Sequence, residues 1–161
     1  MLSVPRCLGS AVLAGGMLWG QALRVSPSTA ERNTTGSFSI RVESPSAKTL
    51  VALQWDLVVP PALAIGTSDI LIGRTAETAH KSLTCAQRSG KDGPPRGVRY
   101  SCILAGGRQP IGNGPIATVR YRSKADVGGA PIRVAIERVV GVSADLKRLD
   151  IPNVDALVKV R

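Results

Sequence analysis

The sequence has very few of the side chains on which most catalytic and metal sites are built. In 161 residues it contains one histidine, three cysteines, two tryptophans, two tyrosines and one phenylalanine. One histidine argues against a histidine-based catalytic apparatus or a zinc site. That histidine, His80, lies in a polar segment, and no Gly-x-Ser-x-Gly elbow accompanies it. We therefore predict no catalytic residues and a protein that is not an enzyme.

Carboxylates and glycines are present, but not in the spacing that cofactor sites need. Asp145, Asp150 and Asp155 lie near one another in the sequence, yet they lack the Asp-x-Asp-x-Asp-Gly spacing of a calcium loop. The glycine-rich segments 105–107 and 111–115 precede no helical pattern and do not end in Gly-Lys-Ser/Thr, so we interpret them as turns. We expect no cofactor; the alternative is a calcium held loosely at these aspartates.

Long apolar runs are also missing, apart from a short one at the N-terminus. Arg6 precedes the apolar residues 7–20, and small residues at Gly20 and Ala22 fit a signal-peptidase site. Residues 1–22 are therefore predicted to be a cleaved signal peptide. An uncleaved anchor is the alternative, although this run is short and glycine-rich beside the about 20 apolar residues of a membrane span. The mature domain, residues 23–161, is expected to lie in the periplasm or outside the cell without a stable membrane span.

Basic residues outnumber acidic ones, 21 to 11, which gives a formal charge of +10. Removal of the signal peptide takes away Arg6 and leaves +9. The positive charge comes without a Lys/Arg run and with few aromatic rings to stack bases, so nucleic acid is not the expected partner. A solvated basic surface is the plainer interpretation, and attraction to anionic cell-surface polymers is another.

Alternation of apolar and polar residues dominates the rest of the chain. It is interrupted by Gly, Pro, Asn and Asp clusters, and the only helical signal is a possible turn at residues 76–80. This pattern predicts a single all-β domain of about nine strands, an antiparallel sandwich or barrel. The predicted strands are residues 23–25, 36–43, 49–59, 69–72, 81–88, 97–105, 116–122, 131–140 and 154–160.

The same alternation sorts side chains into core and surface. In segment 49–59 the odd-numbered residues from Val51 to Val59 are predicted to point inward, while Gln54 and Asp56 face out. The four aromatic residues of the mature domain share a face with apolar neighbours and are assigned to the core: Phe38, Trp55, Tyr100 and Tyr121. This leaves no aromatic strip for binding a flat polysaccharide.

Cys85 and Cys102 are the two cysteines of the mature domain, and they flank a strong turn signal at residues 89–97. The midpoint between them falls at Gly93 and Pro94, so a hairpin folded there places the two cysteines opposite each other. In an oxidising compartment we predict a disulfide, worth about 3 kcal/mol from loop closure. The alternative is a pair of buried free thiols.

The order of these segments resembles a known family. The first strand, residues 23–25, is followed by Pro27 and then by strand 36–43, which begins with glycine. The next strand contains Leu-Gln-Trp-Asp at residues 53–56, and Pro60, Pro61 and Leu63 follow it. Later come Gly-Pro-Ile-Ala-x-Val-x-Tyr at 114–121 and Val-x-Ala-Leu-Val-x-Val at 154–160. Over residues 23–161 this is similar to the cohesin domain. The resemblance implies an all-β fold, a single nine-stranded antiparallel jelly-roll sandwich related to bacterial cellulose-binding modules. It also implies that the domain docks a dockerin protein through one sheet face in polysaccharide-degrading assemblies.

Two binding functions follow as hypotheses. In the first, the protein is a docking module for a dockerin-like or other acidic exported protein, because arginine pairs well with carboxylates. The outward residues that are candidates for its face are Gln54, Asp56, Arg99, Ser101, Arg120 and Arg122. In the second, it is a carbohydrate-binding module that binds polysaccharide directly, and the missing aromatic strip argues against this.

Overall fold

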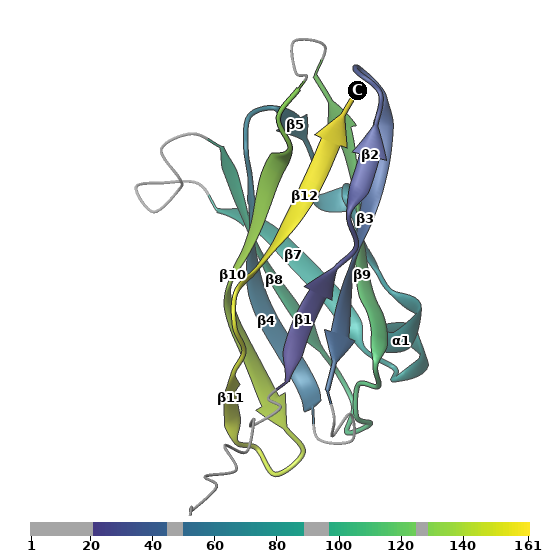
Figure 1. The fold of residues 1–161 in the computed structure, drawn as a ribbon. Coiled ribbons are helices and arrows are strands. Elements are labelled where there is room, and N and C mark those ends of the chain that lie inside the picture. Colours follow the sequence, from purple (N-terminus) through teal and green to yellow (C-terminus); the bar gives the residue numbers. More distant parts are fainter. Residues whose placement is uncertain (1–20, 45–49, 89–96, 125–128) are drawn as a thin grey trace, which may run out of the picture.

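The computed structural model describes residues 21–44, 50–88, 97–124 and 129–161, and its strands form two sheets packed as a sandwich (Figure 1). The five-stranded sheet has the order β1-β3-β9-β5, with β6 also paired to β9. Its strands are β1 (Ala22–Val25), β3 (Thr35–Glu43), β5 (Leu63–Ala64), β6 (Ile70–Ile72) and β9 (Gly114–Ser123). A 3-10 turn (Thr67–Asp69) and the one short helix of these residues, α1 (Arg74–Thr78), lie on either side of β6 in the sequence.

The seven-stranded sheet has the order β2-β12-β10-β4-β8-β7, with β11 paired to β10. Its pairings are antiparallel except for β2, which runs parallel to β12. The N-terminal segment thus crosses from one sheet, as β1, to the other, as β2. The strands are β2 (Ser28–Ala30), β4 (Leu50–Val59), β7 (Ser82–Arg88), β8 (Val98–Ala105), β10 (Ile132–Ser143), β11 (Arg148–Asp150) and β12 (Val154–Val160).

The predicted all-β sandwich is confirmed, with twelve strands among the described residues instead of nine. The three that the sequence did not predict, β2, β5 and β11, have two or three residues each. Alternation cannot be recognised over so short a stretch, and these strands exist because a longer neighbour pairs with them. The parallel β2–β12 pairing is likewise a correction to the fully antiparallel prediction.

Between the sheets lies one core in which the predicted inward residues meet. Phe38, Trp55, Tyr100 and Tyr121 are all buried, as the alternation predicted. Val51 is a correction: it is half-buried, and Leu50 is buried in its place. A register shift between β4 and β10 at this end of the strand reverses the alternation and turns Leu50 toward the core.

The predicted disulfide is confirmed. Cys85 on β7 and Cys102 on β8 are direct register partners, their Cα atoms are 4.1 Å apart, and their sulfurs are bonded. Of the turn predicted between them, only Gly97 lies within the described residues. The bond joins β7, at one end of the seven-stranded sheet, to its neighbour.

The predicted signal peptide falls on undescribed residues except for Gln21 and Ala22. Ala22 is the first residue of β1, where it pairs with Glu43. Cleavage after Ala22 stays a prediction, as does the division at residue 23. In the part of the chain that the structure covers, no helix is long and apolar enough to cross a membrane.

Candidate functional site

The six candidate binding residues do not share a single face. Gln54 and Asp56 lie on β4, and Arg99 and Ser101 lie on the adjacent β8 of the seven-stranded sheet. Arg120 and Arg122 lie on β9, which belongs to the five-stranded sheet. Alternation shows which residues of a strand face outward, but it does not show which sheet the strand joins.

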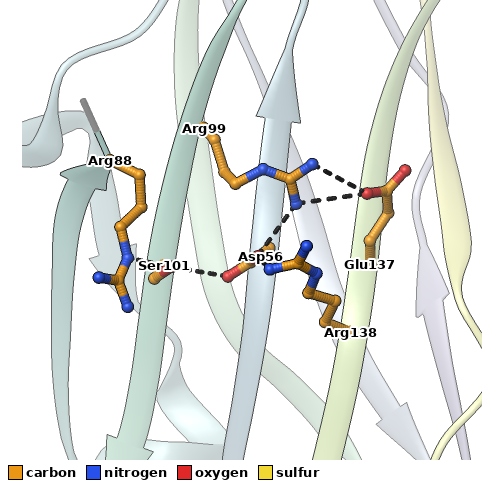
Figure 2. A network of polar contacts seen from close by, with 6 residues as sticks. All are labelled: Asp56, Arg88, Arg99, Ser101, Glu137 and Arg138. Carbon is orange, nitrogen blue, oxygen red and sulfur yellow. Dashed lines mark hydrogen bonds and ion pairs between the residues drawn. The ribbon is translucent and has the colours of Figure 1, made fainter. Parts of the chain in front are cut away.

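Asp56 is at the centre of the polar group on the seven-stranded sheet (Figure 2). It was predicted to face solvent, but only 4% of it is exposed. Its Oδ2 accepts a hydrogen bond of 3.0 Å from Nη1 of Arg99, and its Oδ1 accepts one of 2.7 Å from the Ser101 hydroxyl. Asp56 does sit on the outer side of the sheet; the side chains of neighbouring strands cover it.

Arg99 extends this contact to the next strand. Its Nη1 and Nη2 both donate to Oε2 of Glu137 on β10, at 3.3 Å, and 11% of its side chain is exposed. Its Nε is buried and has no partner among the described residues. One guanidinium therefore holds carboxylates from β4 and β10 together, and these two acids compensate a charge that burial would otherwise disfavour.

Two further arginines complete the polar network, which we define as Asp56, Arg88, Arg99, Ser101, Glu137 and Arg138. Arg88 on β7 donates from Nε to the Ser101 hydroxyl at 3.0 Å, and Nη1 of Arg138 lies 3.7 Å from Oδ2 of Asp56. The network crosses β7, β8, β4 and β10 (Figure 2). It gives this face fixed charges whose geometry is set by four paired strands.

Glu137 and Arg138 were not identified from the sequence. They lie at a bulge, where the register between β10 and β4 shifts between Glu137 and Val140, and Arg138 has a φ of 51°. The signal was present as two consecutive polar residues between Ile136 and Val139, which breaks the alternation of the segment. Such a break indicates a bulge, and a bulge redirects side chains.

Exposed apolar side chains accompany the network. Ile103 on β8 is 51% exposed, Leu157 on β12 is 53% exposed, and both lie on strands of the seven-stranded sheet. In the ladder, Ile103 stands between Thr84 of β7 and Gln54 of β4. This face therefore combines apolar contact area with ordered charge, which is the composition of protein interfaces.

The residues considered for chemistry are dispersed. His80 is exposed at the turn after α1. The three aspartates that could have held calcium each face a different cation: Asp145 faces Lys147, Asp150 faces Arg148, and Asp155 faces Arg133. Within the described ranges, no three His, Cys, Asp or Glu side chains gather as metal ligands would.

No family model matches the chain, and neither does any curated protein. Solved structures do match it. A non-cellulosomal cohesin from the archaeon Archaeoglobus fulgidus is 11% identical with a TM-score of 0.65, over 88% of this chain and 91% of that one. The cohesin–dockerin complex Coh-OlpA-Doc918 from Clostridium thermocellum contains a chain that is 12% identical, with a TM-score of 0.65. The match covers 88% of this chain and 99% of that one.

A third similar structure is the cohesin module of a family 33 glycoside hydrolase from Clostridium perfringens. It is 8% identical with a TM-score of 0.61, and the match covers 88% of this chain and 97% of that module. At these identities the likeness is one of fold. The resemblance to cohesins that the sequence suggested is confirmed at that level.

Proposed function

From the cohesin-like fold of this chain, we propose that it is a non-catalytic docking module that binds a dockerin-type protein partner. The observation that carries the proposal is the match over 88% of the chain to cohesin structures, several of which were solved in complex with dockerins. The disulfide is compatible with an oxidising compartment. We propose that the protein reaches such a compartment through its predicted signal peptide. A place in extracellular polysaccharide degradation is the context that the resemblance implies.

The outer face of the seven-stranded sheet is the docking surface in this proposal. Its polar network holds its charges in position before a partner arrives, so little side-chain ordering remains to oppose binding. Ile103 and Leu157 supply exposed apolar area on strands of the same sheet. The other sheet also has an exposed apolar side chain, Leu71 on β6, which is 40% exposed.

The direct test is binding of the oxidised protein to a panel of purified dockerin modules, with calcium and with a chelator, measured by surface plasmon resonance. Ile103→Arg places a charge in the proposed face and should weaken binding at least about tenfold, as expected when a central apolar contact is lost. Leu71→Arg is the matched control, because it makes the same kind of change on the other sheet. The affinity of Leu71→Arg for the dockerin should stay within about twofold of the wild-type value.

Two results would argue against this function. If no dockerin of the panel binds in either condition, the fold has been retained without the docking activity. If Leu71→Arg weakens binding and Ile103→Arg does not, docking occurs, but through the five-stranded sheet.

A further inference from the structure

A groove on the side of the sandwich contains the two candidate arginines that the polar network leaves out. Its volume is about 940 Å³, and residues of both sheets line it, among them Val59, Val98 and Arg120. It opens beside β9, where β5 pairs with residues 122–123 and β6 with residues 117–119. The chain between β5 and β6 forms part of its wall. None of the residues of the polar network lines it.

Positive charge is concentrated along one wall of this groove. Arg120, Arg122 and Lys124 are exposed at alternate positions, with Tyr121 and Ser123 buried between them. Arg120 and Arg122 are alternate residues of β9, so they point the same way about 7 Å apart. Lys124 directly follows the end of the strand at Ser123 and extends this row of cations.

Little negative charge opposes this row. Asp69 is the one carboxylate among the lining residues that the structure describes. It lies 3.9 Å from Nη2 of Arg120, and its Oδ2 also accepts the backbone N–H of Gly66 at 2.8 Å. Arg122 and Lys124 form no ion pair with any described carboxylate. Two cations thus remain for a ligand.

Close contacts fix the walls of the groove. The buried Tyr100 of β8 donates its hydroxyl hydrogen bond to the carbonyl of Ile65 in the wall. Gly97 has a φ of +135°, and a Cβ there would stand 2.4 Å from the carbonyl oxygen of Val59. Backbone packed this closely fixes one side of the groove, so the site exists before a ligand binds.

The spacing and chemistry of the row select the ligand. An extended peptide repeats its side chains at the same interval of about 7 Å on each side, so acidic residues at alternate positions match the three cations. Guanidinium groups pair with carboxylates in forked hydrogen bonds. The four described aromatic rings are all buried, which leaves none of them to stack on bases or sugars. We propose that this groove binds an extended acidic peptide segment with carboxylates at alternate positions.

This site is independent of the proposed docking face, and the experiment separates the two. The oxidised protein is titrated into fluorescein-labelled Glu-Val-Glu-Val-Glu and into its isomer Glu-Glu-Glu-Val-Val, with fluorescence anisotropy as the measurement. The alternating peptide should bind more tightly than the isomer. Arg122→Glu/Lys124→Glu should weaken it at least about tenfold at low salt, since two charge-assisted contacts are reversed. Ile103→Arg should leave peptide binding unchanged.

A charge-matched control distinguishes the groove from the general attraction of a basic protein. Arg41→Glu/Arg108→Glu makes the same change in net charge at exposed residues that do not line the groove. It should alter peptide affinity by no more than about twofold, because screening weakens distant surface charges. Circular dichroism checks the fold of each variant. If the glutamate variant unfolds, Arg122→Gln/Lys124→Gln removes the charges without reversing them.

Several outcomes would overturn the proposal: no peptide binding, equal affinity for the two isomers, or an equal loss in the charge-matched control. Polygalacturonate and an oligothymidylate serve as further probes. If either polymer binds more tightly than the alternating peptide, and the groove variant loses that binding, the ligand of the groove is that class of polymer. Loss of dockerin binding with peptide binding retained would overturn the docking function alone.

Discussion

Asp56 is the carboxylate whose environment differs most from the surface position that its place in the sequence predicted. It is held by Arg99 at 3.0 Å and by Ser101 at 2.7 Å, and 5% of its side chain is exposed. Removing it would leave the guanidinium of Arg99 with Glu137 as its remaining acid. The burial of Asp56 and Arg99 therefore depends on polar partners from neighbouring strands.

We expect Asp56→Ala to lower the free energy of unfolding by about 3 kcal/mol, because breaking a buried ion pair leaves an uncompensated charge. Asp56→Asn should cost less, since its side-chain oxygen can still accept from Ser101. Asp150→Ala is the matched control, because its pair with Arg148 is exposed and should contribute little. Urea denaturation measures all three. Equal effects of Asp56→Ala and Asp150→Ala would show that the network adds no stability.

A second prediction at this scale concerns Asp145. The hydroxyl of Ser143 and then the ammonium of Lys147 donate to its carboxylate and lower its pKa from 3.8 to about 2. A carboxyl group with a lower pKa in the folded state stabilises the fold above its unfolded pKa. That contribution is lost as the pH falls from about 4 toward 2.

Ser143→Ala should therefore raise the pKa of Asp145 toward 3.8, which an NMR titration of the carboxyl carbon would measure. Lys147→Met should raise it by a smaller amount, because Lys147 is the second contributor. Asp145→Asn should flatten the acid side of the stability profile between pH 4 and 2. An unchanged titration midpoint in Ser143→Ala would contradict the assigned cause.

At the scale of elements, β7 depends on one neighbour in its sheet. It stands at the end of the seven-stranded order and pairs with β8, to which the disulfide joins it. Edge strands are held by fewer contacts than central ones and open first. The cystine adds a covalent link where the sheet has least support.

Cys85→Ser/Cys102→Ser should lower the free energy of unfolding by about 3 kcal/mol, the loop-closure value for a loop of this size. The separation between the cysteines is 17 residues. Hydrogen exchange should increase first in β7, while the central strand β4 keeps its protection. Wild-type protein treated with a reductant provides the control without substitution. Equal loss of protection in β4 and β7 would show that the bond acts on the whole fold.

At the scale of the whole molecule, the predicted cleavage of the signal peptide would change the formal charge. Cleavage after Ala22 would remove Arg6 and the first residue of β1, and leave a domain with a formal charge of +9. Leu23 would become the N-terminus, and its buried side chain keeps β1 on the sandwich.

We expect the protein recovered from the periplasm or culture medium of its organism to have the mass of residues 23–161, with a cystine. Intact mass spectrometry with and without reductant measures both. An inactive signal-peptidase site, made by Ala22→Arg, is the control and should retain the precursor. A full-length mass in the membrane fraction of wild-type cells would instead support an uncleaved anchor.

Much of the fold could be predicted from local pattern. Alternation located nine of the twelve described strands and assigned Phe38 and Trp55 to the core, and the turn between Cys85 and Cys102 predicted their bond. These features depend on neighbours along the chain or across one hairpin. The bulge at Arg138 left a local signal too, in two consecutive polar residues.

The candidate site could be predicted only in part, because it depends on which strands become neighbours. Alternation correctly predicted that Asp56 and Arg120 point away from the core. Asp56 is nevertheless buried in a network, and Arg120 belongs to the other sheet and lines a groove there between residues of both sheets. Pairing of strands far apart in sequence brings Arg99 between Asp56 and Glu137.

The sequence by itself determined an all-β chain, the core position of its four described aromatic residues and the disulfide, since alternation, turns and hairpin geometry are local properties. The tertiary structure decided which outward residues share a surface. Sheet membership follows from long-range hydrogen bonding between strands, and burial of a polar residue follows from what neighbouring strands place over it. Sheet membership and the burial of polar residues are both properties of the assembled sandwich. The proposed docking face and the basic groove depend on them.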